Sequence, residues 1–117
     1  MITLFVQYYD AKNKTRQEEI DFCFLKNIEN KNINQIIVLA ENGIDVPFQS
    51  NKLTSIHITK RPTYRDWVTL SSEYVDEGLS VLINSDIYFD NSVMLMHQAF
   101  TERITLIALT RWDLQGD

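Results

Sequence analysis

The sequence predicts an α/β domain in which helices flank a single doubly wound, mainly parallel sheet. Short runs of β-branched and aromatic residues alternate with segments that carry apolar residues at helical spacing, as expected for strand–helix units. The runs at residues 36–40 and 81–83 are apolar throughout, which is typical of parallel strands buried on both faces. No repeat, low-complexity tract or linker divides the 117 residues, so we expect one domain, 1–117.

The first half of the chain contains three strand-like segments and one helix-like segment. Residues 2–8 and 36–40 are rich in β-branched or aromatic residues and predict the first two strands, and residues 55–59 predict a short third one. Residues 13–29 predict a helix between the first two strands. Its inward stripe consists of Ile20, Cys23, Phe24 and Ile28, with Phe22 and Leu25 widening it.

The second half predicts two further helices and two strands. Thr63 is a suitable cap for a helix that ends at Gly78, and residues 81–83 form the fourth strand. The acid and amide at residues 90–91 offer a cap for a third helix, and residues 104–109 form the last strand. One face of the middle helix carries Tyr64, Trp67, Val68, Ser71, Tyr74 and Val75, and one face of the third carries Val93, Met96, His97 and Phe100.

Composition restricts the classes of function. Hydrophobic residues make up 44% and charged residues 23% of the chain, as in ordinary globular proteins. The net charge of −5 argues against a nucleic-acid partner, which needs a basic surface. The start of the chain lacks a signal-peptide pattern, and no apolar run reaches the ~20 residues that span a bilayer, so we expect a cytoplasmic protein. Cys23 lies in the helical stripe and is interpreted as a packing residue.

Common catalytic and phosphate-binding motifs are missing from the sequence. With 3 glycines, it has neither G-x-G-x-x-G after the first strand nor G-x-x-x-x-G-K. It also lacks G-x-S-x-G, and His57 and His97 are interpreted as core residues, so a hydrolase triad has no support. If this sheet binds a nucleotide, a metal ion and side chains must hold the phosphates.

Residues 81–90, V-L-I-N-S-D-I-Y-F-D, are the most informative stretch. An apolar strand ends there in three polar residues, and open α/β sheets bind ligands at the carboxyl ends of their strands. Asp86 at that edge suits a hard divalent cation, which takes oxygen ligands. The same three residues are also typical of a simple polar turn, and the stretch by itself leaves both interpretations open.

The order of the segments resembles the nucleotide-sugar-binding half of a GT-A glycosyltransferase. The resemblance lies in the first strand and helix, R-x-T-Y-x-D at 61–66, the stretch at 81–90, and A-L-T-R-W-D at 108–113. It covers nearly the whole chain and implies a Rossmann-like, GT-A-like fold that binds a nucleoside-diphosphate sugar, with a UDP-sugar favoured. Such enzymes commonly run well past 117 residues, so the resemblance also implies a fold truncated at the C-terminus.

In that family a short acidic motif, usually D-x-D, holds Mn²⁺ or Mg²⁺ on the donor diphosphate. Here the motif is N-S-D, in which the first acid is replaced by Asn84. The resemblance therefore implies that Asp86 is the metal ligand. It also places Asn84 and Ser85 at the nucleotide, where Asn84 supplies an oxygen or bonds the donor ribose.

The resemblance assigns the nucleobase to the ends of the first two strands. Gln7, Tyr8 and Tyr9 occupy the end of the first strand, and a tyrosine there can stack on uracil or simply cover the core. Glu41, at the end of the second strand, takes the place of an acid that contacts the base or the ribose. An exposed turn acid is an equally good interpretation of Glu41, because Gly43 follows it closely.

Basic residues upstream of the N-S-D motif are candidates for the diphosphate. Arg61 and Arg65 stand at the start of the middle helix, and we expect one of them to bind phosphate oxygens through two parallel hydrogen bonds. Asp66 then fixes that arginine or bonds the base. Trp67 is interpreted as a core residue because it lies in the apolar stripe.

The end of the chain is assigned to the sugar and the acceptor. Arg111 and Trp112 would lie near the donor sugar, and Asp113 is the candidate general base for an acceptor hydroxyl. The competing interpretation is an exposed acid near the C-terminus.

Three classes of function follow. The first is a minimal glycosyltransferase, in which a divalent cation neutralises the leaving diphosphate and the sugar passes to an unknown acceptor or, slowly, to water. The second is a non-catalytic nucleotide or nucleotide-sugar binding module, and the third is a structural protein that retains the fold. A site that lacks its C-terminal half also makes a homo-oligomer attractive, because a second subunit can complete it.

Overall fold

The computed structural model describes residues 1–90 and the backbone of one further strand at residues 104–109. Five parallel strands form one sheet in the order β3-β2-β1-β4-β5. The strands are β1 (Ile2–Tyr8), β2 (Gln35–Glu41), β3 (Leu53–Ile58), β4 (Gly78–Ile83) and β5 (Ile104–Leu109), and the described helices are α1 (Lys14–Glu29) and α2 (Tyr64–Tyr74). The predicted α/β class and parallel sheet are confirmed. The predicted third helix falls on residues 91–100, outside the described part of the chain.

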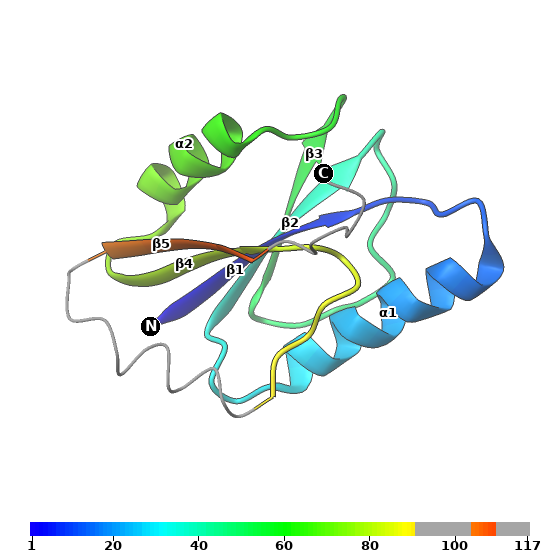
Figure 1. Cartoon of the computed structure of the whole chain (residues 1–117), viewed down its shortest axis with the longest axis horizontal. Helices are drawn as coiled ribbons and strands as arrows, with labels where there is room; N and C mark the ends of the chain where they lie inside the picture. The colour runs from blue at the N-terminus through cyan, green and yellow to red at the C-terminus, as the bar shows by residue number, and fades with distance from the viewer. Residues whose placement is uncertain (91–103, 110–117) are drawn as a thin grey trace, which may run out of the picture.

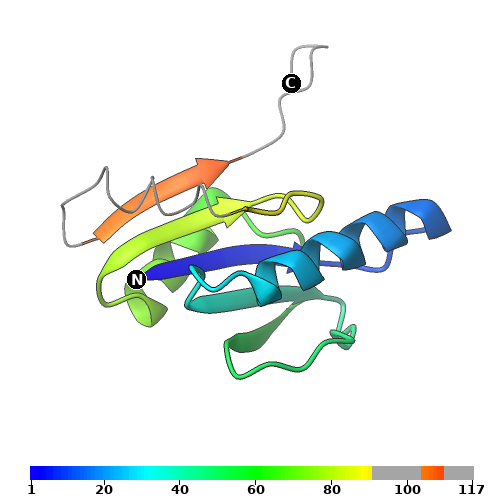
Figure 2. The same cartoon turned by 90° about the horizontal axis from the view of Figure 1, so that it is seen from below.

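The two helices lie on opposite faces of the sheet (Figure 1, Figure 2). Because successive strand residues point to opposite faces, β1 supplies both layers of the core. Leu4 and Val6 pack with Phe24 on the α1 face, whereas Phe5 packs with Trp67 on the α2 face. None of the helices in the described ranges is long and apolar enough to cross a bilayer.

Helix α1 begins where the sequence predicts, but it buries a narrower stripe. The Asn13 side chain caps it by accepting hydrogen bonds from two backbone N–H groups at 2.8 and 3.2 Å. Phe22 and Leu25, expected to widen the apolar stripe, are 51% and 47% exposed, whereas Asn27 is buried. A helix lying on a sheet covers only the residues that face the strands, so its flanks stay in solvent. Cys23 is buried, as predicted.

Helix α2 begins at the predicted capping residue but ends earlier than predicted. The Thr63 hydroxyl accepts from the Asp66 N–H while the Asp66 carboxylate accepts from the Thr63 N–H, which forms a capping box. The helix stops at Tyr74 and is capped by Val75, so the prediction that it ends at Gly78 is wrong.

The buried face of α2 is also narrower than predicted. Trp67 is 5% exposed, which confirms its place in the core, but Tyr64 and Val68 are 57% and 49% exposed.

On the outer strand β3, His57 is exposed, and its interpretation as a core histidine is wrong.

Gly78 begins strand β4, three residues earlier than the sequence predicts. Its φ of +97° is a conformation that L side chains rarely adopt. A Cβ atom at this position would lie 2.0 Å from the Met1 carbonyl oxygen. That same oxygen accepts a 2.8 Å hydrogen bond from the Leu79 N–H, so the glycine lets β4 pair with the start of β1.

We expect Gly78→Ala to lower the free energy of unfolding by at least about 3 kcal/mol, because backbone strain is joined by loss of the Met1–Leu79 contact. Gly43→Ala is the matched control, since Gly43 also has positive φ (+71°) but nothing within 4 Å of an added Cβ. The control should cost about 1–2 kcal/mol. Equal losses in urea unfolding would contradict this account of β4.

Candidate functional site

The parallel register brings the carboxyl ends of three strands to one edge of the sheet. Val6 is level with Val38 in β2 and with Ile83 in β4, so the residues that follow each of them lie side by side. A pocket of about 510 Å³ opens at this edge, where open α/β sheets bind their ligands. It is lined by Gln7, Tyr9, Arg16, Leu39, Arg61, Pro62, Thr63, Tyr64, Trp67, Leu82, Ile83, Asn84, Ser85 and Asp86.

The N-S-D motif forms a tight turn that also lines the pocket. The Asn84 carbonyl accepts a 3.1 Å hydrogen bond from the Ile87 N–H, which closes the turn directly after β4. The Ser85 hydroxyl donates to the Gln7 carbonyl and ties the turn to the end of β1. The motif is therefore a polar turn, and this turn carries Asp86 to the pocket.

Two asparagines, Asn27 in α1 and the C-cap residue Asn30, hold the segment that follows the turn. The Asn27 amide donates to the Ile87 carbonyl at 3.1 Å, and its oxygen accepts from the Phe89 N–H at 3.0 Å. The Asn30 amide donates to the carbonyls of Phe89 and Asp90, each at 3.1 Å. These bonds satisfy backbone groups that otherwise have no strand partner, and they fix the turn against the helix.

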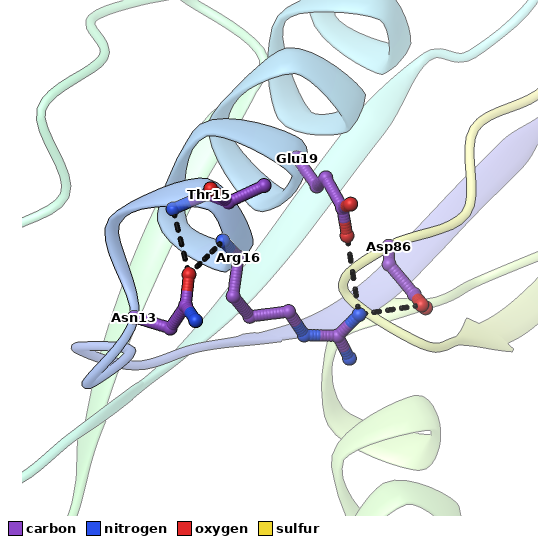
Figure 3. Close-up of polar contacts among 5 residues, drawn as sticks. All are labelled: Asn13, Thr15, Arg16, Glu19 and Asp86. Atoms are coloured by element: carbon purple, nitrogen blue, oxygen red, sulfur yellow. Dashed lines mark hydrogen bonds and ion pairs between the residues drawn. The ribbon is translucent and has the colours of Figure 1, made fainter.

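Arg16, in the first turn of α1, forms the central ion pair of the site (Figure 3). Its Nη1 lies 3.0 Å from Asp86 Oδ2 and 3.4 Å from Glu19 Oε2. The Asp86 side chain is 7% exposed, whereas that of Arg16 is 38% exposed. Hydrogen bonds with the side chains of Tyr9 and then Asp86 raise the pKa of Arg16, so the guanidinium stays charged.

These contacts do not fit a metal ion held by the protein. Asp86 is the one acid among the described residues that line the pocket, and it is already paired with a guanidinium. No group of three or more His, Cys, Asp or Glu residues in the described part of the chain is placed to hold a metal. The predicted role of Asp86 as a ligand of Mn²⁺ or Mg²⁺ therefore stays a prediction.

Only some of the residues predicted to contact the nucleobase line the pocket. Gln7 and Tyr9 line the pocket, and the Gln7 amide donates a hydrogen bond to Glu41. Glu41 lies in an adjacent hollow of about 390 Å³, which Tyr9 also lines. Tyr8 is 3% exposed on the α1 face, where its hydroxyl donates to Asp21 at 2.8 Å. Tyr8 is thus a core residue that does not line the pocket.

Of the two candidate arginines near the start of α2, one lines the pocket. Arg61 lines the pocket and Arg65 does not. Asp66 is used by the capping box, and the hydrogen bond from the Thr63 backbone lowers the pKa of its carboxyl. Trp67 lines the pocket from the core, held by a 3.1 Å hydrogen bond from its ring N–H to Ser80.

The predicted sugar and acceptor residues, Arg111, Trp112 and Asp113, lie outside the described residues. Arg16 is a charged pocket residue that the sequence did not single out. Its signal was topological: a helix that follows the first strand of a parallel sheet begins at the carboxyl edge, so its first turn faces that edge.

Comparisons with protein-family models, with curated proteins and with solved structures found no match for this chain. The pocket and its side chains are therefore the basis for inferring function.

We expect Asn27→Ala to destabilise the protein by about 2–3 kcal/mol, because the change leaves the Ile87 carbonyl and the Phe89 N–H without their partner. Glu18→Ala, at an exposed position of the same helix, is the control and should cost less than about 0.5 kcal/mol. Urea unfolding measures both losses of stability. A loss for Asn27→Ala no larger than for Glu18→Ala would contradict the role of Asn27 in holding this segment.

The Tyr8 hydroxyl gives a pH-dependent prediction. Burial, and then the hydrogen bond to Asp21, raise its pKa above the ordinary value of 10.0. The unfolded chain therefore loses this proton first, so the stabilisation is complete below pH 10.0 and declines as the pH rises above it. Tyr8→Phe cannot titrate, and the difference in free energy of unfolding between wild type and variant should shrink between about pH 9 and about pH 11. A constant difference would contradict the assignment.

Proposed function

We propose that this chain binds the nucleoside-diphosphate part of a sugar donor in the carboxyl-edge pocket, as the nucleotide-sugar-binding half of a GT-A glycosyltransferase does. The observation that carries the proposal is the convergence of Tyr9, Arg61 and the N-S-D turn on one hollow of about 510 Å³. A pocket of that volume is within the range that accommodates nucleotide-sized ligands. The strand order, with β1 between β2 and β4, supports a Rossmann-like arrangement.

In this proposal different residues of the pocket bind different parts of the donor. Tyr9 is partly buried and offers an aromatic face to a base, with a uracil favoured, and Gln7 offers an amide to its polar edge. Arg61 matches the phosphate oxygens with a planar pair of N–H donors. Asn84 and Ser85 also line the pocket and are assigned to the ribose in this proposal.

Glycosyl transfer would break the bond between the anomeric carbon and the diphosphate while an acceptor oxygen forms the new bond. Negative charge builds on the leaving diphosphate, and preorganised cationic side chains stabilise it. Asp113 remains the proposed general base, and Arg111 and Trp112 remain proposed contacts of the sugar. No step of this proposal depends on a metal ion.

A second candidate is a binding module that holds the nucleotide sugar without turning it over. One observation favours it. Asp86 is the single acid among the described residues of the pocket, and its ion pair with Arg16 makes it a poor general base. Release of UDP from a UDP-sugar, measured in the presence of simple alcohols and in water, distinguishes the two candidates.

Calorimetric titration with UDP, GDP and their sugars, with and without Mn²⁺, tests the proposal. We expect Arg61→Ala to weaken nucleotide binding by about 10- to 100-fold, because it removes a charged hydrogen-bond donor from the pocket. Arg65→Ala makes the same change of charge at a residue that does not line the pocket and should alter affinity by less than about twofold.

A thermal-shift assay provides an independent measurement. A nucleotide present at about 100 times its Kd should add about 2.7 kcal/mol to the free energy of unfolding. If no nucleotide or nucleotide sugar stabilises the protein, with or without Mn²⁺, then both the transferase and the binding module are excluded.

A further inference from the structure

We infer that Arg16 is a further cationic ligand of the diphosphate in this pocket, beside Arg61, and that Asp86 positions Arg16, so that binding needs no divalent cation. The inference rests on the proposed function, which supplies the diphosphate as the ligand. It adds Arg16 to the binding residues, and it gives Asp86 a positioning role in place of the predicted role as a metal ligand.

The charges of the pocket favour an anion. Its described lining contains two arginines, Arg16 and Arg61, and one acid, Asp86, in a chain whose net charge is −5. Among the lining residues the cations therefore outnumber the acid, which favours a diphosphate over a divalent cation. Glu19, the second acid at Arg16, lies outside this lining and is 57% exposed. Asn84 is uncharged, so the turn carries the single negative charge of Asp86, which one guanidinium neutralises.

The geometry of the ion pair presents Arg16 to the pocket. The carboxylate is enclosed at 7% exposure, while the guanidinium reaches the surface at 38%. Figure 3 shows the Arg16 side chain extending from α1 to the Asp86 turn, with Nη1 between the two acids. A guanidinium has five N–H donors, so contacts with Asp86, Glu19 and the Tyr9 side chain still leave donors for other acceptors.

Asp86 is held in a manner that suits positioning. Its turn is fixed at three points: by the bond between Asn84 and Ile87, by the Ser85 hydroxyl on β1, and by Asn27 of α1. A carboxylate that is fixed and enclosed keeps a long, flexible arginine in one orientation. A divalent cation at the same oxygen would have to displace the guanidinium first.

The test measures the affinities of UDP and of inorganic pyrophosphate by calorimetry in EDTA and again in Mn²⁺. For the wild-type protein, we expect the two media to give affinities within about twofold. Arg16→Gln should weaken binding of both ligands at least about tenfold in EDTA, because a charged donor is lost. Glu19→Gln is the control: it changes the other acid at Nη1, which is 57% exposed, and should change affinity less than about twofold.

A double-mutant cycle separates positioning from metal binding. Asp86→Asn changes the net charge as Glu19→Gln does, yet it should weaken binding about fivefold or more because Arg16 loses its anchor. In the Arg16→Gln background, Asp86→Asn should cause no further loss. The double variant also removes both members of the pair together, so no buried charge is left without a partner, and its cooperative unfolding verifies that the fold is intact.

The possible results distinguish failure of this inference from failure of the proposed function. Binding of UDP that requires Mn²⁺, and that Asp86→Asn abolishes whatever stands at position 16, overturns the inference and leaves the proposed function standing. Arg16-dependent binding of pyrophosphate in EDTA, with UDP binding no better than pyrophosphate, supports the role of Arg16 and contradicts a nucleotide site. Failure of both ligands to bind in either medium overturns the inference and the proposed function together.

Discussion

The parallel pairing of β1 with both β2 and β4 is the constraint on which the rest of the structure depends. A central parallel strand is buried on both faces, so helices must cover the sheet from both sides, and α1 and α2 do so. The same pairing brings the ends of the three strands to one edge, where Gln7 meets the turn after β4. A slip of one residue would exchange the two faces of β1 and separate these groups.

Helix α1 connects this core to the site. Phe24 packs on the sheet, Asn27 and Asn30 hold the segment after the N-S-D turn, and Arg16 reaches across to Asp86. One helix thus supplies core packing, backbone hydrogen bonds and the charge at the pocket. The position of the guanidinium is therefore set by the same contacts that stabilise the fold, which preorganises the site for a ligand.

On the α2 face of the sheet, buried polar groups also serve both the core and the pocket. The Trp67 ring N–H donates to the Ser80 hydroxyl, which is also hydrogen-bonded to Ser71 at 2.7 Å. This network joins α2 to β4 and satisfies three polar groups within the core. It orients Trp67, whose ring forms part of the pocket wall, so that the wall is built from a core residue.

The sequence by itself determined what depends on local pattern. Strand and helix periodicity, the Thr63 cap and the burial of Trp67 follow from residues close together in the chain. Tertiary structure decided which of Tyr8 and Tyr9 lines the pocket, and that the N-S-D turn meets a guanidinium. Arg16 and Asp86 are separated by 70 positions, and no local pattern pairs residues that only the register of the sheet brings together.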